Sequence, residues 1–167
     1  MMSLNYYLSQ SCKGNPEAAF EAARIMYNDG TNEVIVQNQL RKAAEGNNAE
    51  AQRWLGLFGL CNKLVNPEST VSHITYYHGY EKAYHWLLKS ASLGDNVSAF
   101  IVAKCLQNGV GVAKDESKAE KIIAHIVSEL SLDAIFPVVM LFDTIRSVEG
   151  NRSKSVETVD LRQLLAS

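Results

Sequence analysis

Three glycines, Gly14, Gly46 and Gly94, each precede a segment rich in small and apolar residues, and a second helix-length segment follows every time. The glycines are 32 and 48 residues apart. Periods in this range, with two helices per period, are typical of helical solenoids. The repeats of a solenoid bury their faces against their neighbours, and the curvature of the stack creates an extended concave surface. The pattern therefore favours binding of another macromolecule over catalysis.

The composition fits a single domain. The chain has 167 residues, of which 47% are hydrophobic, and it is long enough to bury one core without disulfides or metals. Its 16 basic and 18 acidic residues give a net charge of −2. This balance lacks the basic footprint that phosphate contacts require, so we expect no nucleic-acid partner.

The sequence shows neither a secretory signal nor a membrane-spanning segment, so we expect a cytoplasmic protein. The first ten residues carry no basic region followed by an apolar run, so they do not resemble a secretory signal. The longest apolar run, 134–142, is too short to span a membrane, so we expect no membrane insertion. The three cysteines, Cys12, Cys61 and Cys105, are odd in number and widely spaced, and we expect free thiols in a reducing compartment.

Capping residues place the expected helices. Asn15, Pro16 and Glu17 are typical of a helix start, Asp115 is a good N-cap, and Gly46 and Gly94 are expected at helix ends. These signals divide a single domain, 1–167, into repeats of about 14–45, 46–93 and 94–130, followed by a cap and tail at 131–167. The expected helix pairs cover about 16–28 and 33–45, 49–60 and 81–92, and 97–107 and 116–130.

The pattern weakens after residue 130. Residues 132–142 are apolar enough for a further helix that caps the stack, although Pro137 should kink it or mark its start. From Arg146 the chain becomes polar, so we expect a loop. A short amphipathic helix carrying Leu161, Leu164 and Leu165 should follow, and it either docks on the last repeat or frays.

The segments GNNAEAQRWLG, NGVGVAKDESKA, KAYHWLLKSASLG and RKAAEGN resemble the Sel-one-like repeat family, a relative of the tetratricopeptide repeats. The first repeat departs from the family pattern because it lacks the G-x-G-V turn. The resemblance implies an all-α, right-handed α-solenoid of about three antiparallel helix pairs plus a C-terminal capping helix. The first, or A, helix of each pair should line the concave side. The family typically mediates protein–protein interactions and is not known for an active site.

Candidate partner-binding positions follow from aligning the three A helices on Ala18, Ala51 and Ser98. The groove-facing positions of the related tetratricopeptide helix then correspond to Glu17, Phe20, Arg24, Tyr27, Glu50, Arg53, Leu57, Leu60, Val97, Phe100, Lys104 and Gln107. Aromatic, aliphatic and arginine side chains in one set resemble the centre of a protein interface. The alternative interpretation is that Phe20, Leu57 and Phe100 belong to the core.

The connection from about Cys61 to Tyr80 is unusually long for a compact domain, and such loops are often functional. Its aromatic content argues against a solvated linker. We expect residues 70–80 to pack on the edge of the solenoid and to extend the partner surface, with Tyr76, Tyr77 and His78 as contacts.

Few residues suggest chemistry. His73, His78 and His85 could in principle ligate a metal, but their spacing is not a recognised ligand pattern, so we expect no metal and no cofactor. Gly109 and Gly111 form only a fragment of a phosphate-binding loop. We interpret Trp54 and Trp86 as core residues between repeats, more firmly for Trp86.

The hypothesis is therefore a non-enzymatic, protein-binding solenoid. Its size and composition suggest a bacterial immunity or inhibitor protein that sequesters a toxin or effector. A regulatory or scaffolding adaptor is the alternative, and a metal-dependent hydrolase that uses the three histidines is the rival from another class. The oligomeric state is left open.

Overall fold

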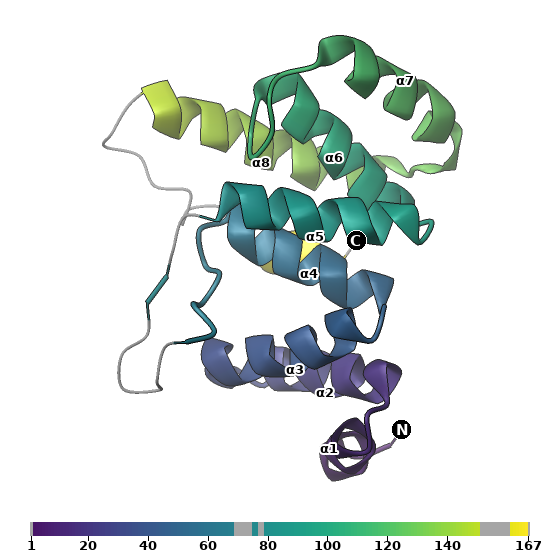
Figure 1. Ribbon diagram of the computed structural model, residues 1–167, viewed down its shortest axis with the longest axis vertical. Helices are drawn as coiled ribbons and strands as arrows, with labels where there is room; N and C mark the ends of the chain where they lie inside the picture. Colours follow the sequence, from purple (N-terminus) through teal and green to yellow (C-terminus); the bar gives the residue numbers. More distant parts are fainter. Residues whose placement is uncertain (1, 69–74, 77–78, 151–160, 167) are drawn as a thin grey trace.

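The computed structural model describes residues 2–68, 75–76, 79–150 and 161–166, which form a stack of α-helices (Figure 1). The helices are α1 (Leu4–Cys12), α2 (Pro16–Asn28), α3 (Glu33–Glu45), α4 (Ala49–Leu60), α5 (Tyr80–Ser92), α6 (Asn96–Asn108), α7 (Glu116–Ile126), α8 (Leu132–Gly150) and α9 (Leu161–Leu165), with a short 3-10 helix η1 (Val127–Glu129) after α7. In this part of the chain the only β-type pairing is one isolated antiparallel bridge between Val65 and Tyr76.

The helices pack in the order expected of a solenoid. Helix α2 packs with α3, α4 with α5 and α6 with α7, and the stack continues because α3 also packs on α4 and α5 on α6. Helix α1 packs on α2 at one end, and α8 packs on α6 at the other (Figure 1). The predicted all-α solenoid is confirmed.

Side-chain caps explain why the helices begin where they do. The Asn15 Oδ1 accepts a hydrogen bond from the Ala18 N–H at 3.1 Å, and the Asn48 Oδ1 accepts one from the Ala51 N–H at 2.7 Å. Asp115 caps α7 in the same way, through the Lys118 N–H at 2.9 Å. Each bond satisfies one of the backbone donors that a helix start leaves without an intrahelical acceptor.

Gly46 ends α3, as predicted. Its φ is −82°, and Asn47 adopts the positive φ, 64°. Asparagine tolerates this region better than most residues. A Cβ on Gly46 would lie 2.6 Å from the Pro16 Cβ, so glycine is required here by the close approach of α2.

At the ends of the chain the structure shows one helix that was not predicted and one that is longer than predicted. Helix α1 was not predicted, although Ser3 caps it and Leu4, Tyr7 and Leu8 pack on the core from helical spacing. Helix α8 was expected to end near residue 142, but it continues through Pro137 to Gly150, where a polar loop was predicted. Within the described residues, every helix, α8 included, is too short or too polar to cross a lipid bilayer.

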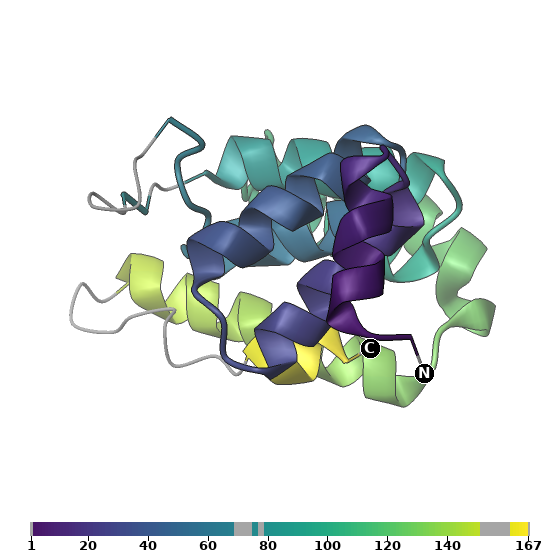
Figure 2. The same cartoon turned by 90° about the horizontal axis from the view of Figure 1, so that it is seen from below.

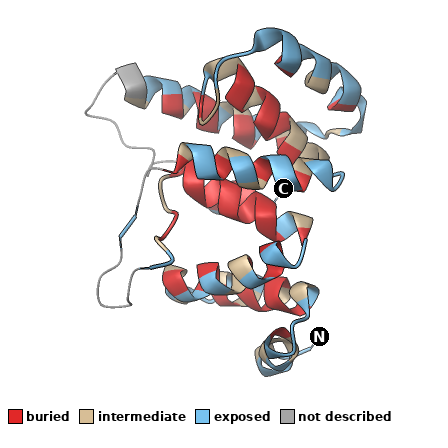
Figure 3. Cartoon of the chain, in the orientation of Figure 1, coloured by how far each residue is buried: buried red, intermediate tan, exposed pale blue. Residues whose placement is uncertain are grey.

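The core runs through the centre of the stack (Figure 3). Helix α4 is its most buried element, because every residue from Ala51 to Leu60 is buried. Helix α5 approaches it so closely that a Cβ on Gly56 would lie 2.4 Å from the Leu87 Cγ. Trp54 is 4% exposed and belongs to this core, whereas Trp86 is only half-buried. Trp86 was expected to be the more deeply buried of the two, so this expectation was wrong.

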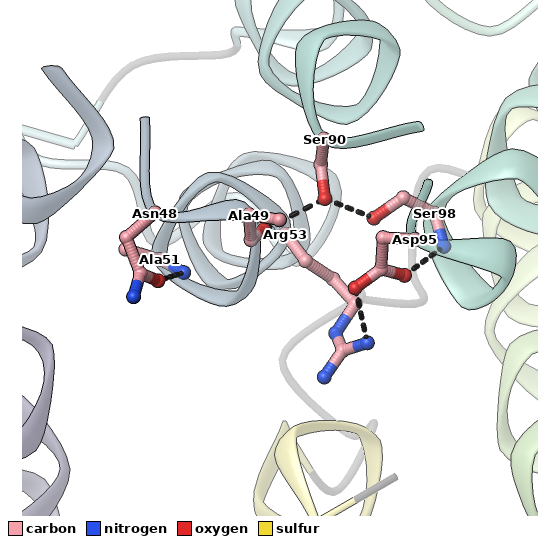
Figure 4. A network of polar contacts seen from close by, with 7 residues as sticks. All are labelled: Asn48, Ala49, Ala51, Arg53, Ser90, Asp95 and Ser98. Carbon is pink, nitrogen blue, oxygen red and sulfur yellow. Dashed lines mark hydrogen bonds and ion pairs between the residues drawn. The ribbon is translucent and has the colours of Figure 1, made fainter. Parts of the chain in front are cut away.

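Two buried serines connect the second repeat to the third (Figure 4). The Ser90 hydroxyl donates a hydrogen bond to the Ala49 carbonyl oxygen at 2.7 Å and accepts one from the Ser98 hydroxyl at 2.8 Å. Both serines are fully buried. The bonds therefore join α4, α5 and α6, and water does not reach the bond between the two serines.

Ser90→Ala should lower the free energy of unfolding by about 1–3 kcal/mol, because it leaves the part-buried Ala49 carbonyl and the buried Ser98 hydroxyl without this partner. Ser92→Ala is the matched control, since the exposed Ser92 hydroxyl bonds only within its own helix turn, to the Lys89 carbonyl. Urea unfolding followed by circular dichroism measures both. Equal midpoints for the two variants would show that the serine network does not stabilise the stack.

Candidate protein-binding surface

The A helices α2, α4, α6 and α8 form one side of the stack, which we call the A-helix face. Helix α9 lies on this face, where it contacts α4 and α8. Figure 2 shows α9, in yellow, beside α2 and α8 and away from α3 and α5. The C-terminal helix was expected on the last repeat, but it docks on α4 of the second repeat. This is the surface predicted to bind a partner.

In the first repeat the predicted positions divide into exposed and buried ones. Arg24 is exposed and forms an ion pair with Glu21 at 2.6 Å, and this hydrogen bond raises the pKa of Arg24. The Glu17 carboxylate is exposed and accepts a hydrogen bond from the Asn48 side chain at 2.9 Å. Tyr27 is half-buried, whereas Phe20 is 4% exposed.

Aromatic rings form the base of this part of the face. Trp54 packs edge-on against Phe20, with ring centroids 5.4 Å apart, and against Tyr27 at 5.8 Å. A cavity of about 360 Å³ opens beside these rings between α2, α4 and α9. Arg24 and Glu50 also line this cavity, so it combines aromatic surface with side chains of both charges.

The second repeat contributes buried positions. Arg53 is 8% exposed, and its guanidinium forms an ion pair with the Asp95 carboxylate at 2.7 Å (Figure 4). Leu57 and Leu60 are fully buried. In this structure Arg53 therefore connects α4 to the start of α6, and the two leucines are core residues. Only Glu50 of the predicted set is exposed here.

In the third repeat Phe100 is 8% exposed, and Val97, Lys104 and Gln107 are half-buried. Lys104 and Gln107 line a polar cavity of about 510 Å³ together with Arg146. Burial lowers the pKa of Lys104, and the nearby Arg146 lowers it further. The burial of Phe20, Leu57 and Phe100 agrees with the alternative interpretation that they belong to the core.

The long connection is held on α3. The buried Gln37 side chain donates a hydrogen bond to the Lys63 carbonyl at 2.7 Å and accepts one from the Val65 N–H at 2.8 Å. Tyr76 is exposed, and its hydroxyl donates to the Glu33 carboxylate at 3.3 Å. Tyr77 and His78 lie outside the described residues. The described part of the connection thus packs on the edge formed by α3, beside the first repeat.

The candidate metal ligands can be followed only in part, because His73 and His78 lie outside the described residues. His85 is exposed and lies edge-on to Trp86. Among the residues that the structure describes, no three His, Cys, Asp or Glu side chains are grouped so that they could hold a metal ion. Cys12 is exposed, and burial raises the pKa of the Cys61 and Cys105 thiols to about 12.

Comparison with known proteins identifies the repeats. The model of the Sel1 repeat matches residues 16–45, 77–95 and 97–121. The crystal structure of a Sel1 repeat protein from Oxalobacter formigenes is similar to this chain, with a TM-score of 0.64 and 25% sequence identity. The similarity covers 81% of this chain and 96% of the other. No curated protein matches the sequence.

The chain therefore contains Sel1 repeats, as the sequence resemblance predicted. Proteins built from these repeats are generally protein-binding helical repeat proteins, and the family is typically a non-enzymatic interaction scaffold. Protein partners are accordingly the class that the repeats suggest.

Proposed function

We propose that the chain captures a protein partner on the A-helix face. The observation that supports this most directly is the cavity between α2, α4 and α9, where Tyr27 and Trp54 offer aromatic surface and Arg24 and Glu50 offer charge. Aromatic and arginine side chains at the centre of a patch are the groups that most often dominate binding energy. Of the predicted positions on this face, seven remain at least partly accessible for this role: Glu17, Arg24, Tyr27, Glu50, Val97, Lys104 and Gln107. Tyr76, on the edge formed by α3, is exposed as well.

Arg24→Glu should weaken the complex with the captured partner by about 1–3 kcal/mol, because it reverses a charge at the mouth of the cavity. Arg24 is exposed, so its replacement should leave the helical circular dichroism signal intact. The matched control is Lys42→Glu, which makes the same change of charge at an exposed position on α3, the second, or B, helix of its pair. The complex is obtained by affinity purification with the full chain as bait and is measured by titration calorimetry. Equal affinities for the two variants would contradict the assignment of this face.

We further propose that the partner is a toxin or effector, which the chain sequesters as an immunity or inhibitor protein. A solenoid that grips its partner over an extended surface is suited to holding it out of action in a tight complex. A regulatory adaptor remains the alternative, because it would use the same surface. The two roles differ in what binding does to the partner.

If the chain is an immunity protein, the partner expressed alone should stop growth, and co-expression of the chain should restore it. The gene for the partner should lie beside that of the chain, and the purified complex should contain one copy of each. Arg24→Glu should restore growth less well than Lys42→Glu, because it weakens the complex. A partner that forms the complex but is harmless on its own would instead favour the adaptor.

A further inference from the structure

The tail helix α9 buries one face against the A-helix face. Leu161, Leu164 and Leu165 are 3%, 2% and 7% exposed, and their spacing of three and four residues places them on the same side of a helix. The side chains between them, Arg162 and Gln163, are exposed. The Arg162 guanidinium lies over the Tyr27 ring, 5.9 Å from its centroid, so α9 also reaches the first repeat.

The burial of α4 shows that α9 covers apolar surface on the A-helix face. Helix α4 packs on α3 and α5, and a helix covered from those directions would keep an exposed stripe on the A-helix face. Yet every residue from Ala51 to Leu60 is buried, because α2 also packs on α4 through Phe20 and Tyr27, and α9 contacts α4 as well. The tail helix therefore covers part of an apolar stripe that the solenoid would otherwise present to a partner.

The space around α9 is larger than the tail itself needs. The cavity of about 360 Å³ lies between α9 and α2, and Leu165 and Ala166 line it. A second cavity of about 890 Å³ lies between α9 and the start of α8, where Phe136 is 62% exposed. A helix longer or bulkier than α9 would find mainly apolar surface beside α8, and aromatic and charged side chains beside α2.

A five-residue helix has little stability of its own, because helices shorter than about 12 residues are marginal in water. Helix α9 therefore owes its structure to the surface on which it docks. A docked segment of this kind competes with any partner for the same surface, and its tethering gives it a high effective concentration.

We propose that the A-helix face over α4 binds a short amphipathic helix of the partner with leucines at positions i, i+3 and i+4. In the absence of the partner, α9 occupies this surface. This inference rests on the function proposed above and specifies the partner segment. The partner must displace α9 to bind. Its helix takes the places of Leu161, Leu164 and Leu165 and extends into the two flanking cavities.

The test uses the full-length chain and a fluorescein-labelled peptide of residues 156–167, VETVDLRQLLAS. Leu164→Asp places a carboxylate at a buried position and should release the tail, because an unpaired charge is strongly disfavoured in an apolar site. Gln163→Asp, which adds the same charge at the neighbouring exposed position, is the control. Fluorescence anisotropy should show that Leu164→Asp binds the peptide at least about tenfold more tightly than the wild-type chain or Gln163→Asp. The same peptide carrying Asp at the position of Leu164 should not bind.

Two results would overturn the inference. One is a Leu164→Asp chain with normal helical circular dichroism that binds the peptide no better than wild type. The other is loss of helical signal in both Leu164→Asp and the milder Leu164→Ala/Leu165→Ala, because the tail would then be an inseparable part of the fold. Neither result bears on Arg24→Glu, which reports on partner binding. The function proposed above can therefore stand when this inference fails.

Discussion

Asp95→Asn should lower the free energy of unfolding by about 3–5 kcal/mol, because it leaves the buried Arg53 guanidinium without its carboxylate partner. The two side chains are each only 9% exposed, and the ion pair is 2.7 Å long. Asparagine is as good an N-cap as aspartate, so the hydrogen bond that the Asp95 Oδ1 accepts from the Ser98 N–H at 2.8 Å can be kept. The substitution therefore removes the charge of the pair and little else.

The control for this variant is Asp115→Asn. Asp115 caps α7 through the same type of hydrogen bond, to the N–H three residues on, but it is exposed, so its replacement should change stability by no more than about 0.5 kcal/mol. Urea unfolding of both variants gives the two free energies directly. Similar losses of stability in the two would mean that the Arg53–Asp95 pair does not hold the second repeat to the third.

Gly111→Ala should destabilise the chain by about 2–5 kcal/mol. Gly111 has a φ of +70°, which costs about 1–2 kcal/mol for an L-residue with a side chain. An added Cβ would also lie 2.1 Å from the Tyr80 carbonyl oxygen at the start of α5, and accommodating it adds a further penalty of about 1–3 kcal/mol. The neighbour is backbone, so a side-chain rotation cannot relieve the clash.

Gly30→Ala separates the two causes. Gly30 has a φ of +76°, but an added Cβ there would meet nothing within 4 Å, so only the backbone strain of about 1–2 kcal/mol applies. In thermal unfolding, each kcal/mol corresponds to about 2–4 °C for a domain of this size. Melting temperatures that fall by the same amount in both variants would show that the turn before α7 yields to the methyl group.

The parts of the fold that the sequence predicted well are those set by local signals. The bounds of α2, α3 and α4 agree with the prediction because Asn15, Pro16 and Asn48 fix helix starts through contacts a few residues away. Helix α1 carried comparable signals at Ser3 and Leu4, but it lies outside the repeat pattern and was missed. The length of α8 was misjudged because the polar residues from Arg146 onward were interpreted as a loop. They continue the helix, whose exposed side accommodates polar side chains.

The candidate site was harder to predict, because exposure depends on contacts between distant residues. Alignment of the repeats selected positions along the A helices, but Leu57 and Leu60 are buried in a helix that α2, α3, α5 and α9 surround. Arg53 pairs with a residue 42 positions away, and no local pattern indicates that. The sequence suggested that the tail helix could dock on the last repeat. In the structure α9 docks instead on α4 and α8.

The central claim is that the A-helix face binds the partner, and hydrogen exchange on the full chain with and without the captured partner tests it most directly. Amide exchange reports local opening, so groups covered by the partner exchange more slowly. We predict slower exchange in α2 and α4 at the residues around Arg24 and Tyr27, with faster exchange in α9 as the tail is displaced. Slower exchange confined to the B helices α3, α5 and α7, with α2, α4 and α9 unchanged, would contradict the account.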